Sequence, residues 1–446
     1  MSNDWLNNLP ADQVIAWRRY IHQNPELSFK EYKTSQYIEQ VLRSFGILQI
    51  EKPTATSVLA ILKGEGPRAA TGKTVMLRAD IDALPVPDET GTDYTSVNPG
   101  ISHACGHDTH AAMLLGAAKV LSENRELING TVLFIFQHAE ELPPGGAIEI
   151  IQSPVMQDRK IDAVFGLHSM TNQKAGLILI YEDGPCSTAA DGFAITITGK
   201  GAHGSMPDKG IDPILTGSEL VLALNTIVSR NIKPGKFGVV SVGTFNAGVA
   251  NNVIPEVTTI TGTVRTTEED IRQTVEERIR TITEHVCKVN GAQFEIKYDR
   301  TYGAVVNDKV LSHLALAAVK KVNGEENAEF DPEMTSGSED FSAYAKLAPI
   351  CFIKLGGGNK EEGYGFSNHN PKFNVVEDSL LYGVRAEVQI VLDFLNSDGE
   401  AEETAPAVKP AKRKSPVKSQ VPDQVKDQTK DQAEKPAKKG RKKTAE

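Results

Sequence analysis

Short apolar runs alternate with helical stretches along most of this chain, and that alternation limits its fold more than any other feature. The runs that read as strands are residues 57–62, 74–77, 132–136, 163–167 and 350–355. Between them, residues 111–123 read as a helix. This order favours an α/β fold with a mostly parallel central sheet flanked by helices. Sites in such sheets gather beyond the carboxyl ends of strands, so we expect Asp80, residues 137–141 and His168 to lie together.

The opening and the middle of the chain differ in the secondary structure that their sequences predict. Residues 12–45 read as helical, because apolar residues recur there at helical spacing. The middle reads as strand 193–198, helix 213–229, strands 238–245 and 256–264, helix 268–288 and strand 293–298. This order predicts a small α+β domain at 189–300, inserted into a larger domain formed by residues 1–188 and 301–397.

Charge is spread unevenly over the 446 residues, whose formal net charge is -10. Residues 401–446 hold 13 Lys and Arg against 7 Asp and Glu, so they carry +6 and the rest carries -16. Apolar residues are scarce after Ser397, which predicts a disordered tail at 398–446. Its basic runs are similar in composition to linker-histone tails. They are either a contact for nucleic acid or acidic surfaces, or a solvated appendage.

The sequence carries no sign of a membrane or of export. No apolar run reaches the roughly 20 residues of a membrane span, and residues 1–10 lack a signal-peptide pattern. The four cysteines, Cys105, Cys186, Cys287 and Cys351, form no CxxC pair and are too few for a disulfide framework. A cytoplasmic location is the expectation.

Residues that bind metals gather in one short segment. Three of the ten histidines lie between positions 103 and 110, together with Cys105. A Cys-x-His pair at a loop-to-helix junction, here Cys105 and His107, can place a thiolate and an imidazole on one metal ion. Gly106 allows the tight turn between them. The alternative, a buried cysteine beside capping histidines, is less consistent with the rest of the chain.

Two adjacent carboxylates, Glu140 and Glu141, follow an apolar strand. Neighbouring side chains at a strand's end point in different directions, so one can bind metal while the other faces a water molecule. Metal ions acidify bound water, and a carboxylate can accept its proton during attack on an amide. His168 and His369 each follow an apolar run or lie in a loop, and both are candidates to complete the set.

At this point the chain resembles a known family. The motifs that carry the resemblance occur in order at residues 78–85, 103–108, 137–141, 166–168, 199–204, 252–255, 337–341 and 369–371. Together they are similar to the hippurate hydrolase branch of the aminoacylase/carboxypeptidase metallohydrolases. That branch includes plant indole-acetyl-amino acid hydrolases and N-acetyl-diaminopimelate deacetylases. The resemblance covers about residues 10–397 and departs from the usual pattern at His138, Asn368 and Asn374.

The resemblance implies a zinc-exopeptidase-like fold and a site with two divalent ions, Mn, Zn, Co or Ni. Its ligands would be Cys105, His107, Glu141, His168 and His369. Glu140 would be the general base. Asp80 and Asp82 would support the ligands from behind. The inserted domain would be a lid and would form a homodimer. The apolar face of helix 213–229 also favours a homodimer.

The implied substrate is an N-acyl amino acid, which offers an amide and a free carboxylate. Arg265 can hold a carboxylate by two hydrogen bonds, and the resemblance implies roles in substrate binding for His203 and Asn252. His203 could donate a hydrogen bond to the oxyanion. Two alternatives stay open: a dipeptidase or carboxypeptidase with the same metal site, and an inactive body that carries a nucleic-acid-binding tail.

Overall fold

The computed structural model describes residues 4–70 and 72–397, so the expected tail lies outside the described residues. One sheet has eight strands in the order β1-β2-β4-β3-β5-β16-β6-β15. Its strands are β1 (Ile50–Glu51), β2 (Val58–Lys63), β3 (Lys73–Asp80), β4 (Gly130–Gln137), β5 (Ala163–Met170), β6 (Ile178–Ile180), β15 (Ala328–Phe330) and β16 (Ile350–Gly356). β4, β3, β5 and β16 are parallel, whereas β1, β2 and β6 introduce antiparallel pairings.

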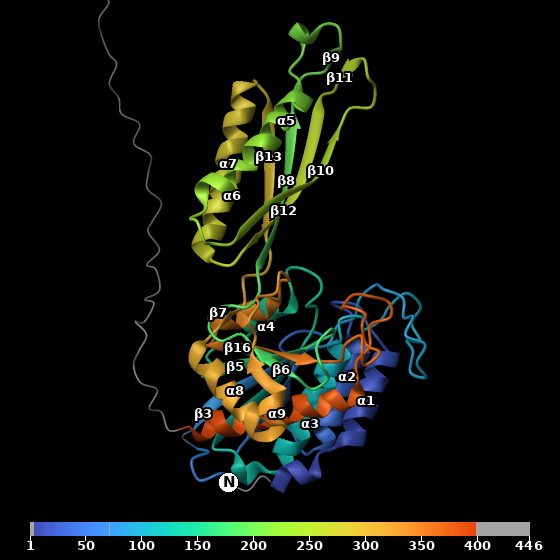
Figure 1. The fold of residues 1–446 in the computed structure, drawn as a ribbon, viewed down its shortest axis with the longest axis vertical. Coiled ribbons are helices and arrows are strands. Elements are labelled where there is room, and N and C mark those ends of the chain that lie inside the picture. Colours follow the sequence, from blue (N-terminus) through green and yellow to red (C-terminus); the bar gives the residue numbers. More distant parts are fainter. Residues whose placement is uncertain (1–3, 71, 398–446) are drawn as a thin grey trace, which may run out of the picture. The chain divides into compact units, whose positions relative to one another are not determined.

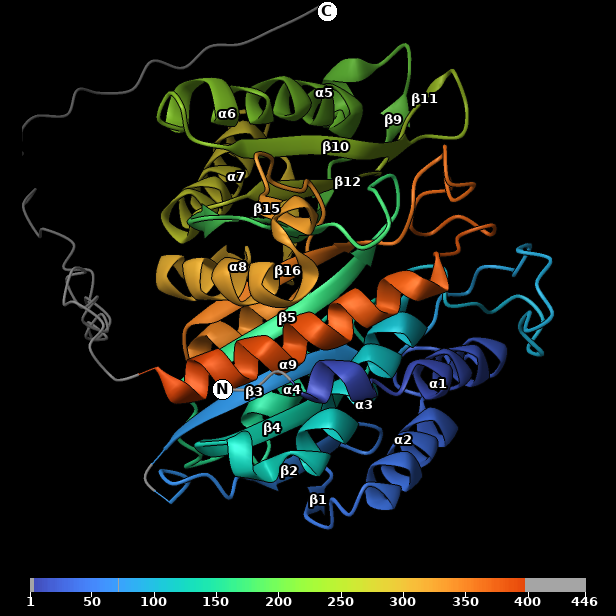
Figure 2. The same cartoon turned by 60° about the horizontal axis from the view of Figure 1, so that its bottom comes forward.

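Both faces of this sheet are buried, which explains why its strands are continuous apolar runs. In β2, Val58, Ala60 and Leu62 face one core, and Leu59 and Ile61 face the other. Figure 2 shows the helices that pack along the sheet. They are α1 (Ala11–Gln23), α2 (Tyr32–Ser44), α3 (His107–Glu123), α4 (Gly146–Gln152), α8 (Lys309–Asn323), α9 (Leu380–Asn396) and the 3-10 helix η5 (Asp340–Lys346). The expected α/β class is confirmed.

A second, antiparallel sheet has the order β10-β12-β8-β13. Figure 1 shows this sheet with its helices as a unit distinct from the first. Its elements are β8 (Ala189–Thr198), α5 (Pro213–Leu224), α6 (Thr226–Asn231), β10 (Gly238–Ala247), β12 (Val257–Thr266), α7 (Glu269–Val289) and β13 (Gln293–Arg300). The three helices cover one face around a core that includes Leu220, Ile260 and Val275. This is the expected inserted α+β domain, and its exact boundaries stay a prediction.

Two small pairings complete the described strands. An antiparallel pair joins β9 (Ala202–His203) to β11 (Val253–Ile254), and another joins β7 (Gly184–Pro185) to β14 (Val306–Asn307). Within the described ranges, no helix is both long and apolar enough to span a membrane. All four cysteines are unpaired and buried.

Three expectations about elements need correction. Residues 12–45 form two helices rather than one, because Pro25 disfavours helical conformation in the residue before it. Helix 213–229 is divided at Asn225 into α5 and α6. His168 lies within β5 rather than after it, since pairing with β16 extends that strand to Met170.

Candidate metal centre and active site

The candidate site forms where β3, β4 and β5 meet the start of α3. Gly106 has φ 90°, a left-handed conformation that favours glycine, and it immediately precedes His107, the first residue of α3. This turn presents Cys105 and His107 to the carboxyl ends of the strands. The predicted use of Gly106 as a tight turn therefore agrees with the backbone.

The five expected metal ligands lie together. Cys105 Sγ is 3.6 Å from His168 Nε2. Glu141 Oε1 is 3.8 Å from His107 Nε2 and 3.2 Å from His369 Nε2. Ligand atoms of Cys105, His107 and His168 lie within 4.8 Å of one another, as do those of Cys105, Glu141 and His369. The two groups share Cys105, an arrangement suited to two neighbouring ions.

The hydrogen bonds of these residues leave the right atoms free for cations. His107 Nδ1 is 3.1 Å from Asp82 Oδ1, and His168 Nδ1 is 2.9 Å from the Ser169 carbonyl oxygen. Each ring therefore donates through Nδ1 and keeps the Nε2 lone pair for a ligand bond. His107 Nε2 is buried without a hydrogen-bond partner. Buried polar atoms rarely stay unpaired, so these residues fit bound divalent ions.

The chemistry of Cys105 agrees with that fit. Burial, reinforced by the negative charge of Glu141, raises the pKa of the Cys105 thiol to about 12. A thiolate at this position therefore requires a cation beside it. Sulfur, imidazole nitrogen and carboxylate oxygen together suit zinc and similar transition metals.

Asp80 is close to His107, and both of its oxygens already accept a hydrogen bond. Its Oδ1 lies 2.5 Å from His110 Nδ1, and its Oδ2 accepts a 2.7 Å hydrogen bond from Arg78 Nη1. His110 Nε2 in turn accepts the backbone N–H of Ser169. These contacts are compatible with the supporting role suggested for Asp80, which stays a prediction.

Three distant side chains hold the backbone of residues 139–141. Glu31 Oε1 accepts the N–H of Ala139 at 2.9 Å, Tyr302 Oη donates to the carbonyl of Glu140 at 2.6 Å, and Asp82 Oδ2 accepts the N–H of Glu141 at 3.0 Å. Ala139 has φ 51°, a conformation that non-glycine residues rarely adopt. We call these contacts the loop clamp. They explain how two neighbouring carboxylates keep separate directions.

Glu140 lies in an acidic, buried environment. Its carboxylate is within 4.8 Å of those of Glu339 and Asp340. Arg78 Nη2 donates to both of these neighbours at 2.9 Å, which compensates part of their charge. Burial, together with the charges of Glu339 and Glu141, raises the pKa of Glu140 well above its usual value. A carboxyl group in this position holds a transferred proton readily.

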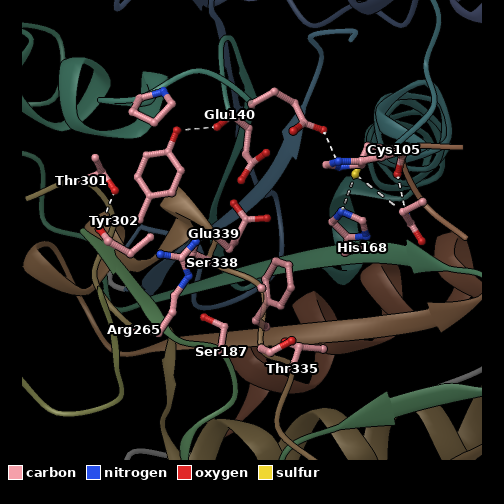
Figure 3. A pocket seen from close by; sticks show the side chains of 18 of the residues that line it. Cys105, Glu140, His168, Ser187, Arg265, Thr301, Tyr302, Thr335, Ser338 and Glu339 are labelled. Atoms are coloured by element: carbon pink, nitrogen blue, oxygen red, sulfur yellow. Dashed lines mark hydrogen bonds and ion pairs between the residues drawn. The ribbon is translucent and has the colours of Figure 1, made fainter. Parts of the chain in front are cut away.

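A cavity of about 670 Å³ opens beside these groups. Its walls include Cys105, Glu140, Glu141, His168 and His369 from the α/β domain and Arg265 from the inserted domain. In the view of Figure 3, Cys105 and His168 lie on one side and Arg265 on another, with Glu140 and Glu339 between them. Arg265 Nη1 donates to the carbonyl of Val264 at 3.0 Å and to the Thr263 hydroxyl. Among the described residues, no carboxylate pairs with it.

His203 and Asn252 do not line this cavity. They belong to the β9–β11 pair and are exposed. The cavity contacts the first residues of β8, such as Ala190, whereas His203 lies beyond the far end of that ten-residue strand. At roughly 3.3 Å per residue, the two ends are about 30 Å apart. The structure therefore brings seven of the nine expected site residues to the cavity or its metal end and leaves these two outside.

Several site residues escaped the sequence analysis. His110 lies one helical turn after His107, a spacing that could have revealed it. Asn368 donates through Nδ2 to the Cys105 carbonyl at 3.0 Å, although it was noted only as a departure from a family pattern. Tyr302 and Glu31 carry no local signal, because their role depends on contacts with residues more than 100 positions away.

Comparisons with known proteins agree with this geometry. Residues 76–393 match the family described as Peptidase family M20/M25/M40. The chain is 47% identical over 295 residues to an N-acyl-L-amino acid amidohydrolase of Geobacillus stearothermophilus, covering 66% of this chain and 78% of that protein. It is 38% identical to thermostable carboxypeptidase 2 of Saccharolobus solfataricus, covering 86% of this chain and 96% of that protein.

A solved structure adds information on the metal. The YXEP protein of Bacillus subtilis, described as a dinuclear metal-binding peptidase of the M20 family, superposes with a TM-score of 0.73. It is 30% identical, and the match covers 88% of this chain and 99% of that one. The match extends over both the α/β and the inserted domain, so the two share one architecture.

Proposed function

The chain belongs to the M20/M25/M40 peptidase family, in its N-acyl-L-amino acid amidohydrolase branch, and from that premise we propose that it hydrolyses N-acyl-L-amino acids. The products would be a carboxylic acid and a free amino acid. Membership of the family makes it a hydrolase of amide or peptide bonds. The observation that carries the finer proposal is Arg265, a cation without a carboxylate partner among the described residues, in the same cavity as Glu140 and the metal donors.

In this proposal Cys105, His107, Glu141, His168 and His369 hold two divalent ions. Such ions polarise an amide carbonyl and acidify water. Glu140 accepts the proton of the attacking water and returns it to the nitrogen of the departing amine. Arg265 fixes the substrate's carboxylate and so orients the amide toward Glu140. The identity of the metal, Mn, Zn, Co or Ni, is part of the test.

The test is a substrate panel with the purified full-length protein. N-acetyl amino acids, hippurate and dipeptides are assayed after chelation and after addition of Mn, Co, Zn or Ni. We expect chelation to abolish hydrolysis of the N-acyl amino acids and one of the metals to restore it. Full activity in metal-free protein would contradict the metal site. Faster cleavage of dipeptides than of N-acyl amino acids would instead identify a peptidase.

We further propose a homodimer formed through the inserted domain. On α5, Leu220 and Leu224 are buried under the domain's own sheet, but Leu215 is 54% and Leu222 73% exposed. β10 is an edge strand and has Phe245 exposed beside α5. Apolar surface at an open sheet edge favours association with a second copy. Light scattering at micromolar concentration should give a dimer, and Leu222→Glu should shift it toward monomer, whereas Glu219→Gln on the same helix should not.

A dimer would also give His203 and Asn252 a role. About 30 Å from the cavity of their own subunit, they can serve substrate only at a neighbouring one. We propose that they reach the partner subunit's cavity, where the imidazole of His203 would donate a hydrogen bond to the oxyanion. Mixed dimers of a His203→Ala subunit and a Glu140→Gln subunit test this. They should regain activity that neither variant has alone.

A further inference from the structure

The cavity holds a second cation, Lys354, that the proposed reaction does not use. Lys354 lies on β16 opposite His168 on β5 in the parallel register, and both side chains line the cavity. Paired residues of neighbouring strands project from the same face of a sheet, with backbones about 4.8 Å apart. The backbone of Lys354 is therefore one strand away from that of His168, a proposed metal ligand.

The Lys354 ammonium is fixed and largely removed from water. Nζ lies 2.7 Å from Asp331 Oδ2, and the two side chains are 12% and 8% exposed. Asp331 does not line the cavity, and its other oxygen accepts the N–H of Glu333. Lys354 is therefore the member of the pair that lines the cavity. An ammonium has three N–H donors and Asp331 takes one, so donors remain for a ligand.

The wall around Lys354 is polar. Ser187 and Thr335 line the same cavity, and Thr335 Oγ1 bonds the carbonyl of Cys186, the residue before Ser187. Figure 3 shows Ser187 and Thr335 close together, away from Cys105. A buried ion pair contributes little to stability over an apolar pair of the same size. An ion pair with one end in a substrate cavity is better explained by recognition.

We propose that Lys354 is a specificity-determining residue that binds a second carboxylate of the substrate, while Arg265 holds the first. The inference rests on the proposed function and deepens it: the preferred substrates are N-acyl amino acids with two carboxylates. The second carboxylate comes either from an acidic side chain or from a dicarboxylic acyl group. Substrates with a single carboxylate offer no acceptor to the remaining Lys354 donors, which disfavours them.

The experiment compares three substrates: N-acetylmethionine, N-acetylglutamate and N-succinylmethionine. The protein is the full-length enzyme loaded with its best metal. For the wild type, we expect kcat/KM to be higher for one of the two dicarboxylates than for N-acetylmethionine. The dicarboxylate that is preferred identifies the source of the second carboxylate. If N-acetylmethionine is hydrolysed best, the inference is overturned while the proposed function stands.

Variants then assign the preference to Lys354. Lys354→Met should lower the ratio of kcat/KM between the preferred dicarboxylate and N-acetylmethionine about tenfold or more, the scale of one charged hydrogen bond. Because Asp331 would lose its partner, Lys354→Met/Asp331→Asn is measured as well, and Lys354→Arg should retain much of the preference. Lys309→Met, on the exposed surface of α8, is the control. An unchanged ratio in the folded double variant would overturn the assignment. If the wild type hydrolyses none of the three, the proposed function fails and this inference falls with it.

Discussion

The α/β domain and the inserted domain handle charge and apolar surface in opposite ways. The α/β domain buries Arg18, Arg78 and Asp108 almost completely and pairs them with other charges. The inserted domain keeps most charges at its surface and exposes large apolar residues such as Leu222. Buried, paired charges fix the orientation of their side chains. Exposed apolar residues favour association with other molecules. In the proposals above, the α/β domain supplies the metal ligands, the base and Lys354, whereas the inserted domain supplies Arg265 and the dimer surface.

The largest expected effects concern the two adjacent carboxylates of the α/β domain. Glu140→Gln keeps the shape but removes the proton acceptor, and loss of a general base typically costs about 10²–10⁴-fold in rate. Its metal content should stay near normal. Glu141→Gln should lose metal, and excess metal should partly rescue it. Metal analysis beside kcat for both proteins is the measurement, and a Glu140→Gln protein stripped of metal would mean that the two roles are reversed.

A second prediction tests the cost of buried charge in the same domain through Glu31. Burial raises the pKa of Glu31 to about 7 from the usual 4.5. The folded protein therefore holds this proton more tightly than the unfolded chain. Between pH 4.5 and 7 the unfolded chain loses it first, so the free energy of unfolding falls as pH rises, by up to about 3 kcal/mol. The substitution Glu31→Gln mimics the protonated carboxyl group and keeps an oxygen that accepts the N–H of Ala139.

Urea unfolding of the metal-free protein at pH 5 and pH 8 measures this effect. Glu31→Gln should be more stable than the wild type at pH 8 and close to it at pH 5. Glu65→Gln, a change at an exposed carboxylate, should follow the wild type at both. Equal pH dependence in the Glu31→Gln protein and the wild type would show that Glu31 is not the group responsible.

The smallest expected effect lies in the inserted domain. Arg265→Met should lower kcat/KM about tenfold to a hundredfold, mainly through KM, because one charged contact to the substrate is lost. The variant should also discriminate less between an N-acyl amino acid and its methyl ester. Arg230→Met on exposed α6 is the control. A fall in kcat alone would place Arg265 in the chemistry and weaken the division between the two domains.

Sequence reasoning succeeded where the signal is local and failed where it depends on contacts between distant segments. The parallel strands and the ligand cluster could be predicted because apolar runs, and residues such as Cys105 and His107, carry local signals. The break before Pro25 was missed because the apolar spacing on its two sides was interpreted as one helical segment. Contacts such as Tyr302 with Glu140 could not be predicted, since they depend on how distant segments pack. The positions of His203 and Asn252 were missed for a related reason: the motifs gave their residue types, but only the ten-residue strand β8 sets their distance from the cavity.

The loop clamp makes the proposed activity depend on segments from both sides of the inserted domain. Its contacts join the segment 139–141 to Glu31, 108 positions earlier than Ala139, and to Tyr302, 162 positions later than Glu140. A nascent chain that has emerged only as far as the inserted domain already contains every expected ligand except His369. It still lacks Tyr302 and thus one of the three contacts that orient the base. Hydrolysis would therefore begin only once synthesis has passed the inserted domain.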